Sequence, residues 1–513
     1  MKRTGVISWV IPIFAFAAGL PSCERQPRAA TGESGTAASD VDGAVGEPSA
    51  SESSQLKPES ESDSFLVDYE PDPACAISEP IPEAFSSLRE IFEDSRKRMT
   101  SLIEQGQSAG EDAVALIVRA DTILRQDRAA MAQELGSDKS FHYASTADRS
   151  LPQEIRDKLR ERIENLEKSE VGSIISRIAD TQHVALRVSN SMVPDHHEPL
   201  LLSKSVVGFN KGRAVLAAMR HDNTAFSARV REMLALGRIV STGGNMLSCI
   251  LAMQTHLEAL SLVELRLAIT ANTDQSLESL DHLFREIQIY PVSRTFHAEL
   301  IQLNKVCALS YFLGDRYSEV LQTPISEDLW NAKPAMPEGE GYVYDTSAGQ
   351  VFLDRPAHHQ LIRIGIQAWA CKALKPTSAR SGSTEAAIIE RCNMIPSIGK
   401  MSKAFTGLIQ AYDIYLAQRT GTLTLIAIER YRLAHGKPPD QLADLVPQYL
   451  PTEPVDPFTG NTLGYRVAKQ SALEKGREFD LYAAGPDGVD DGGIDFQTNG
   501  LSPEPGKDLL INR

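Results

Sequence analysis

The feature that most constrains the fold is a helical repeat of apolar side chains through residues 82–313. Phe226, Val230, Met233 and Leu234 illustrate the repeat, because residues three and four apart fall on one face of a helix. The sequence therefore predicts a mainly α protein, either a multi-helix bundle or an irregular helical array. No internal repeat is visible at the level of residues, so a helical solenoid stays open only as a topology.

The segment Met246–Ile269 is apolar on nearly every side. It also carries ionisable side chains, which would be costly in lipid: His256, Glu258, Glu264 and Arg266. We therefore expect a central buried helix rather than a membrane span. The preceding residues 243–245, Gly-Gly-Asn, predict a sharp helix boundary.

The N-terminus has the order of a secretory signal, with Lys2 and Arg3 followed by an apolar stretch over residues 6–20. This stretch contains Pro12 and is shorter than the roughly 20 residues that a spanning helix needs. We expect residues 1–22 to be removed. The order Leu-Pro-Ser-Cys that ends at Cys23 resembles the lipobox of bacterial lipoproteins, which implies that Cys23 is lipidated. The alternative is ordinary cleavage nearby, with Cys23 an incidental thiol.

Residues 23–64 are rich in Ser, Ala, Gly, Glu and Pro and have almost no large apolar side chains. Such a composition cannot bury enough surface to offset the entropy of ordering. Acidic residues outnumber basic ones here, so we expect a disordered, extended tether that holds the folded part away from a membrane.

The rest of the chain is long enough for two or three domains. We expect a helical domain at residues 65–330, a hairpin-containing linker with helices at 331–400, and a C-terminal module at 401–513. Residues 342–344 and 351–353 would form the hairpin. The net charge of −16 argues against a nucleic-acid partner. The cysteines after Cys23 are five, widely spaced and without CxxC pairs, so they are expected mostly as small core residues.

The C-terminal module is the most informative part of the sequence. A helix is expected to stop at Gly436, before Pro438 and Pro439, and a short helix should follow at residues 441–446. Two strands are expected at 463–467 and 479–484. An acidic glycine loop, residues 485–493, follows the second strand.

The order of short motifs here resembles the globular end of the major, G-type pseudopilins of type II secretion systems. The motifs that carry the resemblance are Ala427 to Leu433 with Gly436 and Pro439, Tyr449-Leu450-Pro451, Asp456-Pro457-Phe458, Tyr465-Arg466, Phe479 to Tyr482, and Gly485-x-Asp487-Gly488. The resemblance covers about residues 423–495 and implies a small α+β module. Pseudopilins begin with an apolar filament-forming helix. This chain begins with a signal, a tether and a helical domain, so it is not expected to be a filament subunit.

The same resemblance implies calcium binding by Asp487, Asp490 and Asp491, together with Asp495. Short carboxylates on a glycine-rich loop can converge on calcium, which takes six to eight oxygen ligands. The alternative is that these Asp-Gly clusters simply make turns.

Two histidine pairs, His196-His197 and His358-His359, were considered as metal sites. Adjacent residues point to different sides of a helix or strand, so solvated loop histidines are the expectation for both pairs. His256 and His297 are expected as hydrogen-bonded core histidines. Nucleophile and phosphate-loop motifs are absent from the sequence.

These patterns predict a non-catalytic, exported envelope lipoprotein. It would be a helical scaffold, held to the membrane by an N-terminal lipid, with a calcium-stabilised module that contacts another envelope protein. The alternative is an envelope hydrolase with a site among the helices, using His196 or His358.

Overall fold

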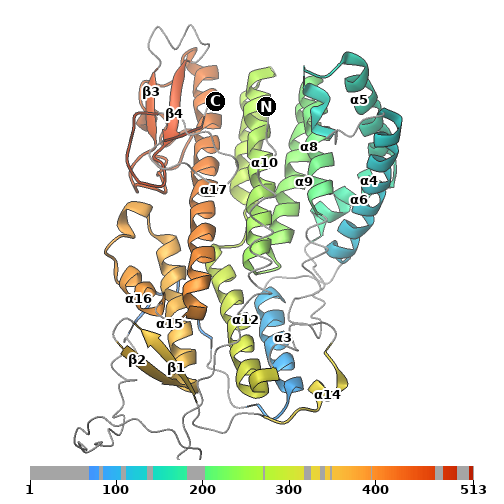
Figure 1. Cartoon of the computed structure of the whole chain (residues 1–513). Helices are drawn as coiled ribbons and strands as arrows, with labels where there is room; N and C mark the ends of the chain where they lie inside the picture. The colour runs from blue at the N-terminus through green and yellow to red at the C-terminus, as the bar shows by residue number, and fades with distance from the viewer. Residues whose placement is uncertain are drawn as a thin grey trace, which may run out of the picture.

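The structure is a computed structural model of the chain, and most of the described residues lie in upright helices (Figure 1). It describes residues 69–79, 85–104, 111–135, 143–148, 150–181, 203–269, 272–316, 325–334, 341–346, 349–393, 396–467, 478–493 and 508–511. Two small antiparallel sheets complete the described part. The predicted fold class, mainly α with a small α+β module at the C-terminus, is confirmed.

The first half of the helical body contains α3 to α10. Their bounds are α3 Leu88–Glu104, α4 Ala113–Leu135, η1 Tyr143–Ala147, α5 Gln153–Lys168, α6 Glu170–Asp180, α8 Ser203–Met219, α9 Asn223–Ser241 and α10 Met246–Ile269. The second half has α11 Asp274–Glu286, α12 Val292–Leu313, η2 Gly314–Arg316, α14 Glu327–Trp330, α15 Arg355–Leu374, η3 Thr377–Ala379, α16 Thr384–Asn393 and α17 Pro396–His435. Both halves share one hydrophobic core.

Helix α10 lies in the middle of this core, between α9 and α17 (Figure 1). Within it, Met246–Ala268 is long and apolar enough to cross a membrane. An 18-residue window of this segment is 67% buried inside the protein. The predicted boundary is confirmed, since Gly244 has a positive φ of 73° and Asn245 caps the helix by accepting a hydrogen bond from the Ser248 amide. Glu299 of α12 accepts a second one from the Met246 amide.

Helix α17 joins the helical body to the C-terminal module. Its first half packs in the large core through Phe405 and Leu408, and its second half packs in the module core through Leu425 and Ile428. The boundary predicted between residues 400 and 401 therefore falls inside one continuous helix. The predicted stop is confirmed, because α17 ends at His435 and Gly436 has a positive φ of 76°.

The predicted hairpin consists of β1 Gly341–Thr346 and β2 Gly349–Asp354. The strands pair with Tyr342 opposite Leu353 and Tyr344 opposite Val351, as the sequence predicts. Asp354, the last residue of β2, also caps α15, because its side chain accepts a hydrogen bond from the Ala357 amide.

The C-terminal module packs a three-stranded sheet against the end of α17. The predicted short helix is η4 Leu442–Leu445, and the two predicted strands are β3 Gly464–Val467 and β4 Phe479–Ala483. A third strand, β5 Leu509–Leu510, pairs with β4 so that the order is β3-β4-β5. Ile511 follows β5 and sits directly against Gly421 of α17, where an added Cβ would be 2.7 Å from three Ile511 carbons.

Candidate functional site

The acidic loop lies between β4 and the last part of the chain. Asp487 and Asp490 each fold back on the loop, accepting hydrogen bonds from the Val489 and Gly492 amides at 3.1 and 2.8 Å. Both are local turns of the kind that Asp side chains form two residues on. Asp490 also lies beside Tyr482: burial first, and then the charge and hydrogen bond of Asp490, raise the pKa of Tyr482 to about 12.

Asp508, which was not among the predicted site residues, holds this loop closed. Its two carboxylate oxygens accept hydrogen bonds from the amides of Asp491 and Gly493 at 3.1 and 2.6 Å. Burial raises the pKa of Asp508. The two amide hydrogen bonds lower this pKa, and the nearby charges of Asp490 and Asp491 raise it, so that the net shift is upward. The signal for Asp508 was a lone carboxylate directly before the apolar run of residues 509–511.

The predicted calcium ligands are thus only partly brought together. Asp490 and Asp491 lie near Asp508. Asp487 belongs to a different turn, in which the neighbouring Gly488 lies beside Ser378 and the Phe458 carbonyl. Asp495 lies outside the described residues. Within the described ranges, no group of three or more His, Cys, Asp or Glu side chains has the geometry to hold a metal ion.

Asp456 organises the turn beneath this loop. Its oxygens accept hydrogen bonds from the Phe458 and Ala484 amides, both at 2.8 Å, which ties the turn to the end of β4. The same turn meets the segment between α15 and α16, because the Ser378 amide donates to the Phe458 carbonyl at 2.9 Å. The module is therefore braced against the helical body as well as attached to it through α17.

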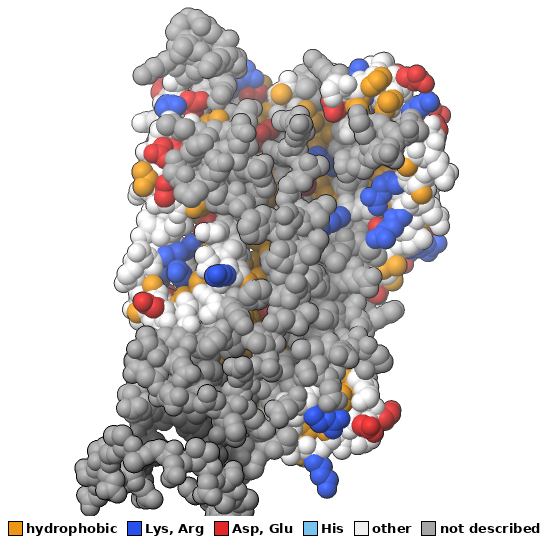
Figure 2. Space-filling model, viewed as in Figure 1, with side chains coloured by type: hydrophobic (Ala, Val, Ile, Leu, Met, Phe, Trp, Pro, Cys, Tyr) orange, Lys and Arg blue, Asp and Glu red, His pale blue; other side chains and the backbone are white. Residues whose placement is uncertain are grey.

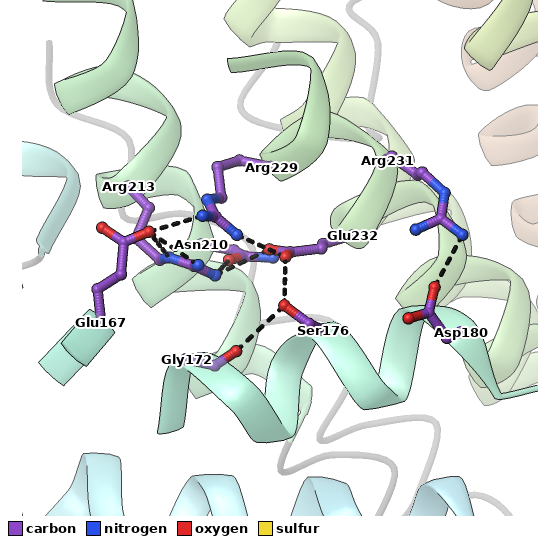
Figure 3. Close-up of polar contacts among 9 residues, drawn as sticks. All are labelled: Glu167, Gly172, Ser176, Asp180, Asn210, Arg213, Arg229, Arg231 and Glu232. Carbon is purple, nitrogen blue, oxygen red and sulfur yellow. Dashed lines mark hydrogen bonds and ion pairs between the residues drawn. The ribbon is translucent and has the colours of Figure 1, made fainter. Parts of the chain in front are cut away.

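A charged cluster connects four helices of the body (Figure 3). Arg213 of α8 donates to Glu232 of α9 at 2.8 Å and to Glu167 of α5 at 2.9 Å, and Arg229 binds the same two carboxylates. Ser176 of α6 adds a hydrogen bond to Glu232 at 3.0 Å. Two guanidinium groups meet two carboxylates, so the cluster is balanced in charge and acts as a tie between helices rather than as a reactive group.

The expectation for His358 and His359 as solvated loop residues is wrong. Both lie in the first turns of α15 and are buried. The Nδ1 of His358 lies 3.0 Å from the Tyr311 hydroxyl, while neither ring nitrogen of His359 has a partner. Burial lowers the pKa of His358 to about 4 and that of His359 to about 3, so both rings are neutral at pH 7.

His256 is the hydrogen-bonded core histidine that was predicted, whereas His297 is hydrogen-bonded but only half-buried. His256 bridges α9 and α17, with Nε2 2.9 Å from the Leu234 carbonyl and Nδ1 3.3 Å from the Tyr415 hydroxyl. His297 lies 2.8 Å from the carboxylate of Glu79. Each histidine therefore joins two segments that are far apart in sequence.

One disulfide joins Cys75 to Cys371 of α15, and the sequence did not reveal this pairing. Three further cysteines are buried and lie outside this disulfide, as expected for core residues: Cys249, Cys307 and Cys392. Burial raises the pKa of Cys249 to about 11 and that of Cys392 to about 12, so neither is a thiolate near neutral pH.

The segment around Cys75, residues 69–79, crosses several helices and is called the strap here. Gln367 of α15 donates to the Ile77 carbonyl at 2.7 Å, and Arg98 of α3 donates to Glu79 at 2.7 Å. Burial favours the neutral form of Glu79, but hydrogen bonds from His297 and Arg98 outweigh it and lower the pKa of this carboxyl. The strap thus ties the N-terminal end of the described residues to α3, α12 and α15.

Lys and Arg side chains gather on the side formed by α4, α5 and α6 in Figure 2. Arginines of these helices are paired with carboxylates, as Arg119 is with Glu170 and Arg162 with Asp127. These pairs neutralise part of the positive charge on this side.

Cys23, His196 and His197 lie outside the described residues. Comparisons with protein-family models, with curated proteins and with solved structures found no match for this chain.

Proposed function

We propose that this protein is an exported, lipid-anchored scaffold of the bacterial cell envelope. Its helical body is a rigid spacer, and its C-terminal module contacts another envelope protein. Lipid on Cys23 is the proposed membrane attachment, residues 23–64 are the proposed tether, and calcium at the acidic loop is the proposed stabiliser of the module. The Cys75–Cys371 disulfide is the observation that carries the proposal.

The disulfide supports export because such bonds form and persist in oxidising compartments and are rare where thiols are kept reduced. It uses two of the six cysteines, and three others are buried. That leaves Cys23, which the sequence places at the end of a lipobox-like segment. An acylated Cys23 would therefore complete the assignment of every cysteine in the chain.

The surface of the module supports a role in contact. Six large hydrophobic side chains are clearly exposed among the described residues, and four of them belong to the module or to the end of α17: Leu433, Val455, Val467 and Val489. Exposed apolar side chains concentrated in one small region are typical of interaction surfaces. The packing of a helix end against a three-stranded antiparallel sheet also agrees with the resemblance to pseudopilins.

The alternative, a hydrolase that uses His358, has less support. This imidazole is buried, is bonded to Tyr311 and has a pKa of about 4 because of its burial. A general base working near neutral pH needs a pKa closer to the working pH and access to substrate.

The proposal is tested by expressing the full chain with its signal in a Gram-negative host. Mass spectrometry of the mature N-terminus should find an acylated Cys23, and detergent partitioning should place the protein in the membrane fraction. Cys23→Ser is the matched variant and should release the protein. An unmodified N-terminus elsewhere would contradict the anchor.

Cross-linking in intact cells should then capture an envelope protein through the module, and loss of that product in Val455→Asp or Val489→Asp would locate the contact.

A further inference from the structure

The Cys75–Cys371 disulfide closes almost the whole helical body into a covalent loop. The two cysteines are 296 residues apart in sequence, and the loop contains every helix from α3 to α12 and most of α15. The chain enters this loop through the strap and leaves it near the end of α15. What remains outside the loop is the N-terminal end of the chain and the stretch from α15 to the C-terminus.

We propose that this disulfide removes the helices from α3 to α12 from the path of force between the N-terminal anchor and the C-terminal module. The inference rests on the proposed function only for the origin of the force, which is a lipid at one end and a bound partner at the other. Tension that enters through the strap crosses from Cys75 to Cys371, because the disulfide is a much shorter covalent route than the backbone of the loop. It then continues through α16 and α17 to the module.

Hydrogen bonds within the strap divide at Cys75 in the way that this path requires. Gln367 to Ile77 and Arg98 to Glu79 lie after Cys75, inside the loop, so tension does not reach them. Tyr69 to Glu385, at 3.3 Å, lies before Cys75 and is therefore under load. This bond to α16 and the packing of Tyr69 against the large core are the contacts that tension would break before it reaches the disulfide.

Arg380 braces the part of the path that is under load. Its guanidinium donates to the carbonyls of Lys372 and Lys375 at the end of α15, at 2.9 and 2.8 Å. It also makes a two-point contact with Asp413 of α17, where one of the bonds is 2.7 Å. Both side chains are buried. The contact clamps the end of α15, three residues beyond the disulfide, directly to α17.

The helices inside the loop are held to one another by contacts that heat would break. Tension along the path described above would not load these contacts. The Arg213–Glu232 pair lies entirely within the loop. Removing it should therefore weaken the body against heat while leaving the mechanical resistance of the oxidised protein unchanged. Removing Arg380 should lower both the melting temperature and the mechanical resistance, because its pair with Asp413 is buried and also lies on the path.

Optical-tweezer extension of the mature chain, with handles at its N-terminus and after Arg513, tests the proposal. The oxidised protein should reach a fully extended contour that is shorter by about 1,000 Å than that of the whole chain, given a separation of 296 residues at roughly 3.5 Å each. Adding dithiothreitol while the chain is extended should release this length in one step. The dithiol gives two electrons to the S–S bond, leaves thiols on Cys75 and Cys371, and becomes a cyclic disulfide.

The variants separate load from stability. Arg380→Met should lower the force of the first major rupture of the oxidised protein, and Arg213→Met should not, although it lowers the melting temperature. Gly237→Ala is a second body variant if Arg213→Met fails to fold. An oxidised protein that already reaches the full contour, or a body variant that lowers the rupture force as much as Arg380→Met does, would overturn the proposal. Neither result depends on lipidation or on a partner. The proposed function could therefore be disproved while this inference holds, and this inference could be disproved while the proposed function holds.

Discussion

The imidazole of His256 occupies the space that a side chain on Gly237 would need. A Cβ on Gly237 would lie 2.3 Å from Cδ2 and 2.8 Å from Nε2 of His256. This close approach lets the Nε2–H of His256 donate to the Leu234 carbonyl on the same helix as Gly237. Helices α9 and α10 are therefore held at their spacing by a glycine and a histidine together.

Gly237→Ala should destabilise the protein by about 1–3 kcal/mol, because the added methyl group overpacks this contact. The matched control is Gly208→Ala in α8, where an added Cβ meets nothing within 4 Å. That change should be neutral or stabilise by up to about 1 kcal/mol, since alanine is the better helix former. Urea unfolding of both variants gives the free energies, and equal effects at the two glycines would contradict the contact.

Arg266→Met should raise the free energy of unfolding. The guanidinium of Arg266 is fully buried over the Phe226 ring, and its three nitrogens have no hydrogen-bond partner. Burial lowers the pKa of Arg266 to about 10, so the group is still charged at neutral pH. Replacing an uncompensated buried charge by an apolar side chain of similar length should stabilise by about 1–4 kcal/mol.

Arg213→Met provides the contrast, because it removes one of two guanidinium groups that pair with Glu232 and Glu167 and leaves Arg229 alone with both carboxylates. It should cost about 3–5 kcal/mol. Thermal and urea unfolding should thus move in opposite directions for these two substitutions of the same type. A loss of stability in Arg266→Met would show that its guanidinium is paired in solution.

Stability should fall as the pH drops from about 6.5 toward 4. Burial lowers the pKa of His256 and His358 to about 4 and that of His359 to about 3. In this window the unfolded chain binds protons that the folded protein cannot, so each histidine removes about 1.4 kcal/mol per pH unit. Above about pH 6.5 the three contributions are constant.

His359→Phe should make this dependence shallower by about 1.4 kcal/mol per pH unit, without loss of a hydrogen bond, since neither ring nitrogen of His359 has a partner. His282→Gln is the control, because the side chain of His282 is mostly exposed. Urea unfolding at pH 7, 6 and 5 gives the slopes. An unchanged slope in His359→Phe would mean that His359 titrates normally in the folded protein.

Calcium should protect the acidic loop of the full-length protein. Asp490 and Asp491 add negative charge near the buried Asp508, and a cation would remove that repulsion. Hydrogen exchange at the amides of residues 485–493 should slow with calcium and speed up with chelator. Asp490→Asn with Asp491→Asn should abolish the difference. If calcium changes neither exchange nor melting of the wild type, the loop is only a turn, and Asp508 alone holds it.

The parts of the fold that were predicted correctly depend on neighbours in sequence. The end of α17 at Gly436, the hairpin of β1 and β2, and the strands β3 and β4 follow from turn chemistry and side-chain period over a few residues. Burial of the Met246–Ile269 helix also follows, because its apolar character is continuous. Such signals do not depend on how distant segments meet.

The missed features depend on those distant meetings. Nothing near Cys75 distinguishes Cys371 from Cys249 as its partner, because pairing is decided by where α15 lies relative to the strap. Asp508 reaches the acidic loop only because β5 pairs with β4. The burial of His359 depends on α12, which brings Tyr311 against it. Local sequence shows Asp508 as a carboxylate before an apolar run but does not record which loop it meets, so the loop was predicted without the residue that closes it.

The contact between Ile511 and Gly421 makes the module depend on two residues that are about ninety positions apart. Ile511 fills a buried place against α17, and β5, just before it, pairs with the edge of β4. Proteolytic loss of residues 508–511 would leave an apolar hole beside α17 and an unpaired edge on β4. Exposed apolar surface and unpaired strand edges favour association between molecules, so trimming of this segment should make the module prone to aggregate.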